Sequence, residues 1–158
     1  MNNPIKQLSI IDESELKAAL ALVQRVFLEF EAPDYSDEGI QHFKQFISFD
    51  TITQQLAAQE LTLWAYFSNE ATITGLIAVR LPNHISLLFV DKAFHRQGIA
   101  RQLMKTATTY CQTIHMATQL TLNSSPYALD AYQHLGFIPI DSQQEVDGII
   151  FTPMKKIL

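Results

Sequence analysis

The chain has 158 residues, of which 47% are hydrophobic and 17% charged, and its formal net charge is −5 at pH 7. This length predicts one domain, residues 1–158, and an acidic chain is a poor general binder of nucleic acid. Apolar runs such as residues 87–90 are too short to cross a bilayer, and no signal peptide or disulfide framework is indicated. We therefore expect a cytoplasmic protein that contacts neither nucleic acid nor membrane.

The first third of the chain predicts one short strand followed by helices. Residues 5–11 are typical of a strand, and Asp12 with Glu15 three residues later resembles a capping box that opens a helix. Apolar residues at helical spacing continue this helix towards Pro33. Ser36 is typical of the N-cap of a second helix, and residues 51–58 indicate another short helical segment.

From residue 61 onward the pattern favours strands. Residues 61–68 and 72–81 are rich in β-branched and aromatic side chains, which predicts two strands joined by a turn. The nearly continuous apolar run at residues 85–90 indicates a strand buried on both faces. A helix with an apolar stripe follows, and then a short strand at residues 120–123.

The last segment predicts one more helix and the final strands. We expect a helix that starts at Ser125, with Pro126 in its first position, and ends at Gly136. Residues 138–140 and 145–154 are typical of strands. The order of elements predicts an α/β fold in which helices pack on a mixed sheet.

The link between the strand at residues 85–90 and the next helix predicts an anion site. The amides at a helix start have no partners within the helix and attract phosphate oxygens. Gly98 and Ala100 leave the backbone accessible, while Arg96 and Arg101 add positive charge. Neither the P-loop pattern nor the dinucleotide pattern Gly-x-Gly-x-x-Gly occurs in the chain. An ordinary helix that happens to start at a glycine is the alternative interpretation.

Acidic residues gather elsewhere, with five of them between residues 29 and 38. Such a cluster attracts cations, which favours a positively charged partner such as an amine. The alternative is a purely structural role, because acidic side chains stabilise the first turn of a helix.

Two motifs resemble the GNAT superfamily of acyl-CoA-dependent N-acyltransferases. In that family a buried strand and a loop lead to Gln/Arg-x-x-Gly-x-Gly/Ala, and here residues 95–100 read His-Arg-Gln-Gly-Ile-Ala. His95 departs from the pattern at the first position. The second motif resembles the later family segment: Asn123 ends a strand, and Tyr132 precedes Leu135-Gly136-Phe137.

The resemblance implies a mostly antiparallel, twisted GNAT-type sheet with helices on both faces, and acetyl-CoA as the cosubstrate. It implies that the backbone of Phe89 and Val90 pairs with the pantetheine arm and that Asn123 reaches its end. Tyr132 would lie near the sulfur and act as the acid. The residues implied at the diphosphate are His95, Arg96, Gln97, Gly98, Ile99, Ala100 and Arg101.

The general base is the open part of this assignment. Many members of the family carry Glu six residues before the last position of the central strand, and here that position is His84. An imidazole can accept a proton near neutral pH. Glu31, Asp34 and Tyr35 are alternatives, since the first two helices border the acceptor groove in this family.

The sequence thus predicts an N-acetyltransferase in which a primary amine attacks acetyl-CoA directly in a ternary complex. The acceptor is a small molecule or a peptide, a homodimer is compatible with the resemblance, and no histidine or cysteine spacing indicates a metal site. Two alternatives are a non-catalytic module that binds acyl-CoA and an enzyme that transfers a longer acyl chain.

Overall fold

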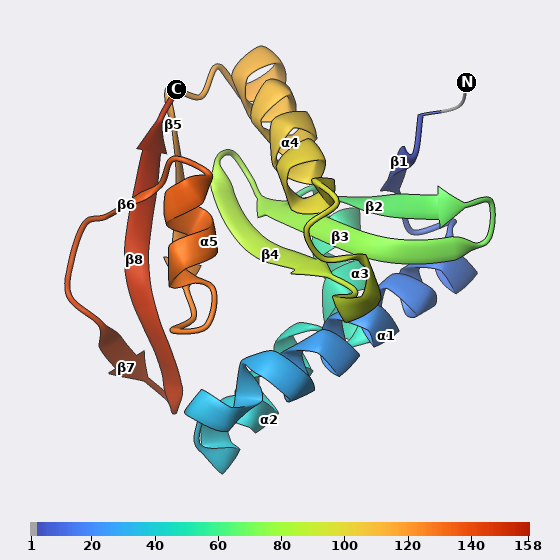
Figure 1. Cartoon of the computed structure of the whole chain (residues 1–158). Helices are drawn as coiled ribbons and strands as arrows, with labels where there is room; N and C mark the ends of the chain where they lie inside the picture. The colour runs from blue at the N-terminus through green and yellow to red at the C-terminus, as the bar shows by residue number, and fades with distance from the viewer. Residues whose placement is uncertain (1–2) are drawn as a thin grey trace.

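The structure is a computed structural model that describes residues 3–158. Figure 1 shows its elements in chain order. The helices are α1 (Glu13–Phe30), α2 (Asp37–Phe46), α3 (Phe49–Ala57), α4 (Ile99–His115) and α5 (Leu129–His134), with 3-10 turns η1 (Ala32–Asp34) and η2 (Lys92–Phe94). The strands are β1 (Ile5–Leu8), β2 (Leu61–Asn69), β3 (Thr72–Arg80), β4 (His84–Val90), β5 (Gln119–Ser124), β6 (Ile138–Pro139), β7 (Gln144–Val146) and β8 (Ile149–Ile157).

The strands form one sheet in the order β1-β2-β3-β4-β5-β8-β6, and β7 pairs with β8. Only the β4–β5 pairing is parallel among the described strands, and the other pairings are antiparallel. The predicted mixed, mostly antiparallel sheet is therefore confirmed. The strand predictions at residues 61–68, 72–81 and 85–90 agree with β2, β3 and β4 to within one residue.

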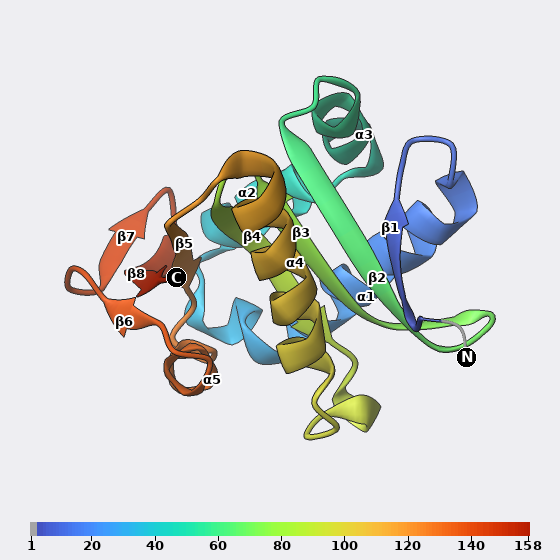
Figure 2. The same ribbon diagram turned by 90° about the horizontal axis from the view of Figure 1, so that it is seen from above.

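Helices cover both faces of the sheet, as predicted. On one face α1, α2 and α3 pack against side chains such as Leu76 and Leu87, and on the other α4 packs against Ile77 and Val79. Figure 2 shows α4 and α1 on opposite sides of the strands. Because both faces are covered, the middle of β3 is buried at every position from Thr74 to Val79. None of the helices in residues 3–158 has the length and apolar character that crossing a membrane would need.

A bulge in β4 separates the two halves of the sheet. The register with β3 passes from Ala78–Leu87 to Val79–Ile85, so Ser86 is the extra, unpaired residue. On its other side β4 pairs with β5 only at His84 and Ile85. Beyond the bulge β4 curves away from β5 (Figure 1), and its edge at residues 87–90 has no strand partner on that side among the described residues.

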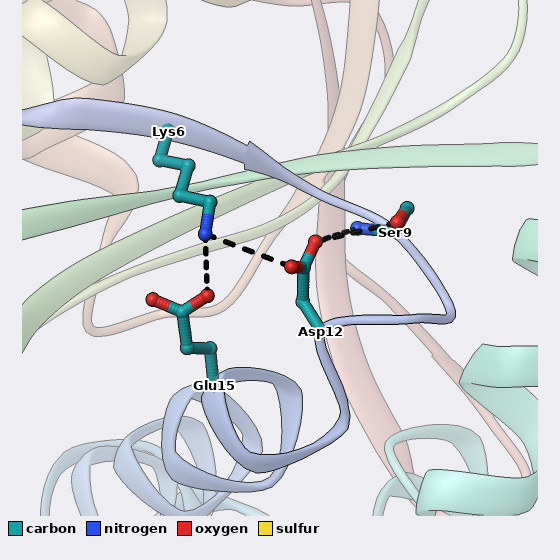
Figure 3. Close-up of polar contacts among 4 residues, drawn as sticks. All are labelled: Lys6, Ser9, Asp12 and Glu15. Carbon is teal, nitrogen blue, oxygen red and sulfur yellow. Dashed lines mark hydrogen bonds and ion pairs between the residues drawn. The ribbon is translucent and has the colours of Figure 1, made fainter.

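The predicted capping box at Asp12 and Glu15 is wrong. The Asp12 carboxylate accepts a hydrogen bond from the Ser9 amide at 2.9 Å, and it makes no cap bond to α1 (Figure 3). Lys6 Nζ of β1 lies 2.6 Å from Glu15 Oε1 and 3.6 Å from Asp12 Oδ1. The cation on the neighbouring strand thus binds both carboxylates and draws them away from the helix start.

Three predicted boundaries also differ from the structure. The last helix starts at Leu129 rather than Ser125, because residues 126–128 form a turn in which the Ser125 hydroxyl accepts from the Ala128 amide at 3.2 Å. The strand predicted at residues 145–154 is a hairpin of β7 and β8. Its turn residues Asp147 and Gly148 have positive φ angles of 53° and 81°, the conformation of a tight hairpin turn. Finally, β1 ends at Leu8 rather than at residue 11.

The β7–β8 turn is fixed against the start of α2. Ser36 caps α2, as predicted, by accepting a bond from the Gly39 amide at 3.2 Å. The Ser36 amide itself donates to the Gly148 carbonyl at 3.4 Å. A methyl group added to Gly39 would overlap that same carbonyl. The absence of a side chain at Gly39 therefore lets α2 and the hairpin approach each other closely.

We predict that Gly39→Ala lowers the free energy of unfolding, by about 2 kcal/mol, because the added methyl group must push α2 and the hairpin apart. At an exposed helix position the same substitution stabilises a protein by roughly 1 kcal/mol, so the sign is diagnostic. Urea unfolding would measure it, with Gln41→Ala on the exposed side of α2 as the control. A Gly39→Ala protein as stable as the wild type would contradict this packing.

Candidate functional site

Two cavities meet beside β4 just beyond its bulge. The first has a volume of about 510 Å³ and is lined by β4, the loop that follows it, the first turn of α4, and α5. The second, of about 470 Å³, is lined by α2, the end of β3 that adjoins the turn to β4, residues 84–89 of β4, β8 and the β7–β8 turn. Five residues line both cavities: Glu31, Leu88, Phe89, Ala128 and Tyr132. Molecules entering from the two sides would meet at these residues.

The first turn of α4 presents open backbone amides to the first cavity. The first bond of the helix runs from the Gln102 amide to the Gly98 carbonyl at 3.0 Å, so the amides from Gly98 to Arg101 have no partner within the helix. Gly98 has a φ of 78° and its free side is open, a conformation that favours glycine. This geometry suits an anion that approaches the backbone closely.

Ion pairs to α1 hold the loop in front of this helix start. Arg25 Nη2 lies 2.8 Å from Asp91 Oδ2, and Lys92 Nζ lies 2.9 Å from Glu29 Oε1. The pKa of Asp91 is held below its usual range by a hydrogen bond from the Ala93 amide and by the contact with Arg25. Lys92 and Glu29 largely neutralise each other, which leaves the positive charge at the cavity to Arg96 and Arg101.

The free edge of β4 offers backbone groups to the same cavity. The Asp91 amide donates to the Thr74 carbonyl at 2.8 Å, and in an antiparallel pair the residues that bond across alternate. By this alternation Phe89 bonds to β3, while the amide and carbonyl groups of Leu88 and Val90 point towards the gap. Leu88, which no sequence pattern singles out, is therefore better placed than Phe89 to pair through its backbone with an extended ligand.

His95 already contacts one of these groups. Its Nε2 lies 2.8 Å from the Val90 carbonyl oxygen, where a protonated Nε2 would donate, and its ring packs near Phe30 with the centroids 5.8 Å apart. The side chain that replaces Gln or Arg of the family pattern thus fixes the end of β4.

Glu31, Tyr35 and Tyr132 form a cluster of titratable groups where the cavities meet. Burial raises the pKa of Glu31 to about 7, an effect partly offset by a hydrogen bond with the Ser125 side chain. Burial and the charge of Glu31 raise the pKa of Tyr132 above its usual value, and the pKa of Tyr35 is raised by the same two causes together with Asp34. A carboxyl group that titrates near neutral pH therefore lies beside two protonated phenols.

His84 lies in the second cavity, away from this cluster. Its Nδ1 is 2.8 Å from the Thr121 hydroxyl oxygen, at the point where β4 still pairs with β5. Burial, and then the nearby charge of Arg80, lower the pKa of His84 to about 4. The imidazole is thus neutral at physiological pH and is held by a neighbouring strand.

The other predicted residues divide between the cavities. Asn123 lines the second cavity rather than the first, whereas Gln97 and Asp34 line neither. The predicted donor-site residues found at the first cavity are Phe89, Val90, His95, Arg96, Gly98, Ile99, Ala100, Arg101 and Tyr132. Sequence reasoning named Glu31 only as one of several alternatives, because its burial depends on α5 and β4, which are distant in the chain.

The chain is similar to known proteins in sequence family and in fold. Residues 31–158 match the family model described as acetyltransferase (GNAT) domain. No curated protein sequence matches the chain significantly. The PaiA N-acetyltransferase of Thermoplasma acidophilum in complex with coenzyme A aligns over 100% of both chains, with a TM-score of 0.78 and 16% identity.

Two further solved structures have a similar fold. A GCN5-related N-acetyltransferase from Rhodopseudomonas palustris has a TM-score of 0.75 and 17% identity, over 100% of this chain and 98% of the other. A chimera of the spermidine N-acetyltransferase SpeG from Vibrio cholerae and hSSAT has a TM-score of 0.64 and 13% identity, over 98% and 96%.

We predict that Glu31→Gln changes how stability depends on pH. Because the pKa of Glu31 is raised from 4.5 to about 7 on folding, the folded protein holds this proton more tightly, and stability falls as pH rises between these values. The variant lacks that fall. It should gain stability relative to the wild type from about pH 5 to about pH 8, by on the order of 2 kcal/mol.

Chemical denaturation at a series of pH values would measure this difference. Glu70→Gln is the matched control, since it removes a carboxylate from the exposed β2–β3 turn. A difference between Glu31→Gln and wild type that stays constant over this pH range would show that Glu31 does not titrate there.

Proposed function

The chain belongs to the GNAT acetyltransferase family, and from this premise we propose that it transfers the acetyl group of acetyl-CoA to a primary amine. The observation that carries the proposal is the meeting of two cavities at Glu31, Leu88 and Tyr132. A donor in the first cavity and an acceptor in the second would form a ternary complex. Direct attack of the amine on the thioester then needs no covalent enzyme intermediate.

The first cavity suits coenzyme A part by part. The open amides from Gly98 to Arg101, with Arg96 beside them, would bind the diphosphate. The backbone groups of Leu88 and the Val90 amide, which face the gap, would pair with the pantetheine amides as an added strand. The coenzyme A complex of a protein with this fold supports the assignment.

Glu31 and Tyr132 would move the protons of the reaction. The acceptor arrives as an ammonium ion, and the Glu31 carboxylate takes a proton so that the nitrogen lone pair can attack the thioester carbon. A backbone amide at the free edge of β4 would stabilise the oxyanion. As the C–S bond breaks, the Tyr132 hydroxyl donates its proton to the departing thiolate. The nitrogen of the tetrahedral intermediate then loses its second proton, which restores the Tyr132 hydroxyl. The products are the acetylated amine and coenzyme A thiol, and Glu31 releases the first proton to water.

We assign the base to Glu31 rather than His84. The raised pKa of Glu31, about 7, matches the working pH of a general base, and this carboxyl group lies where the cavities meet. His84, with its pKa lowered to about 4, accepts a proton less readily and lies farther along β4. His84 then belongs to the wall of the acceptor cavity.

We predict that Gly98→Trp abolishes donor binding without unfolding the protein, because the indole would cover the open amides. Acetyl-CoA should raise the Tm of the wild type, since a ligand that binds the native state stabilises it, and the variant should show no shift. Thr109→Trp, on the exposed face of α4, is the control. The donor site is assigned wrongly if millimolar acetyl-CoA fails to shift the wild type, or if it shifts Gly98→Trp equally.

We predict that kcat/KM for acetylation rises with pH through a pKa near 7, as the Glu31 carboxylate forms. Glu31→Gln should remove this rise of kcat/KM with pH and lower kcat about 100-fold. Tyr132→Phe should lower kcat and keep the rise. Thiol release at saturating acetyl-CoA measures both. If kcat/KM still rises with pH in Glu31→Gln but no longer does so in His84→Ala, the base is His84 and not Glu31. Donor binding with no turnover of any amine would favour a non-catalytic binding module.

A further inference from the structure

The charges of the acceptor cavity lie at separate positions along its wall. Its carboxylates are Glu31, at the junction with the donor cavity, and Asp147, at the β7–β8 turn. Arg80 lies at the other end, where the last residue of β3 pairs with His84. Between these groups the wall includes the apolar side chains Phe43, Phe46, Leu87, Phe89, Ile149 and Phe151, together with the polar residues Tyr35, His42, Ser86, Asn123 and Ser125.

Arg80 has no acidic partner in the part of the protein that the structure describes. It forms no ion pair with any residue in the range 3–158, in contrast to Arg25 and Lys92 of the donor side. The neighbouring His84 is a neutral imidazole, so it supplies no negative charge to the guanidinium group. Lys155 is the cross-strand partner of Thr121 and shares its face of the sheet, which adds positive charge to this end.

Arg80 is exposed and lines the cavity without a protein counter-ion. It suits an anionic group of the ligand, because a guanidinium binds a carboxylate with two parallel hydrogen bonds. The strand pairing gives the distance between Arg80 and the junction of the two cavities. Arg80 pairs with His84. The junction residue Leu88 pairs with Ile77, three residues from Arg80 along β3, a span of roughly 10 Å at about 3.3 Å per residue.

We propose that the acceptor is an amino acid-like molecule whose primary amine reaches Glu31 while its carboxylate binds Arg80, with an apolar body between them. This proposal rests on the proposed function and specifies its acceptor. A polyamine suits this cavity less well, because its far ammonium group would meet the like charge of Arg80. Arg80 is thus the residue that determines specificity for the anionic end.

Matched acceptors test the proposal directly. In a series of ω-amino acids of increasing chain length, each is compared with its methyl ester and with the diamine of equal length, by thiol release at saturating acetyl-CoA. We expect the wild type to favour the carboxylate at one chain length by about ten- to a hundredfold in kcat/KM. Arg80→Gln should abolish this preference through KM, with kcat and the Tm shift by acetyl-CoA unchanged.

Arg80→Lys should restore part of the preference, and Lys44→Gln, which removes a cation of α2 outside both cavities, should leave it intact. A preference of the wild type for diamines or esters would overturn the proposal. So would an Arg80→Gln variant in which kcat/KM falls equally for ω-amino acids and for their methyl esters.

Calorimetric titration of the preferred ω-amino acid into the protein with coenzyme A separates this proposal from the proposed function. Binding that depends on Arg80 without any turnover would contradict the proposed function alone. If amines without a carboxylate are acetylated, and Arg80 makes no difference to the binding of ω-amino acids, the acceptor assignment alone is contradicted.

Discussion

The bulge at Ser86 is the constraint on which the rest of the structure depends. Before it, β4 pairs with β5 at His84 and Ile85, and after it the strands diverge. A continuous ladder would close the gap and bring the walls of both cavities together. The divergence leaves the backbone groups of Leu88 and Val90 without a strand partner, and unpaired backbone groups at a partly buried edge require another partner. An extended, amide-bearing ligand would supply one, so the bulge that opens the site also suits it to the pantetheine arm of the proposed donor.

The distribution of charge follows from the same division of the sheet. The ion pairs Arg25–Asp91 and Lys92–Glu29 fasten the loop after β4 to α1 and neutralise their own charges. The exposed positive charge that remains at the donor cavity is carried by Arg96 and Arg101. Glu31 comes next to this fastened region, at the end of α1, where burial favours its neutral form. The acidic cluster seen in the sequence therefore has no single role, since Glu29 supports the loop and Glu31 lies at the junction.

Local signals account for what the sequence predicted correctly. Continuous apolar runs define β2, β3 and β4, and Gly98 marks the start of α4 because the backbone there has a positive φ. The wrong predictions have two kinds of cause. Some depend on residues that are distant in the chain, and in one case the apolar pattern at residues 145–154 hid a local turn signal. Lys6 approaches Asp12 and Glu15 from another strand, which no pattern within the helix reveals. The turn between β7 and β8 is visible as Asp147-Gly148, a pair typical of tight hairpin turns. The pKa of Glu31 could not be predicted, because it depends on burial by segments far away in the chain.

The two cavities also differ in how far a sequence can specify them. In the proposed donor cavity the groups that suit a phosphate and an extended ligand are backbone groups, namely the free edge of β4 and the amides of one helix turn, so a short motif with one glycine is enough to indicate them. The proposed acceptor cavity is built from side chains of α2, β3, β4, β8 and the β7–β8 turn, and its charged residues Glu31, Arg80 and Asp147 are far apart in sequence. Its chemistry therefore emerges only when the fold brings these groups together. A cation without a counter-ion is informative there, since a charge that the protein leaves unpaired in a cavity is a charge that its ligand can pair.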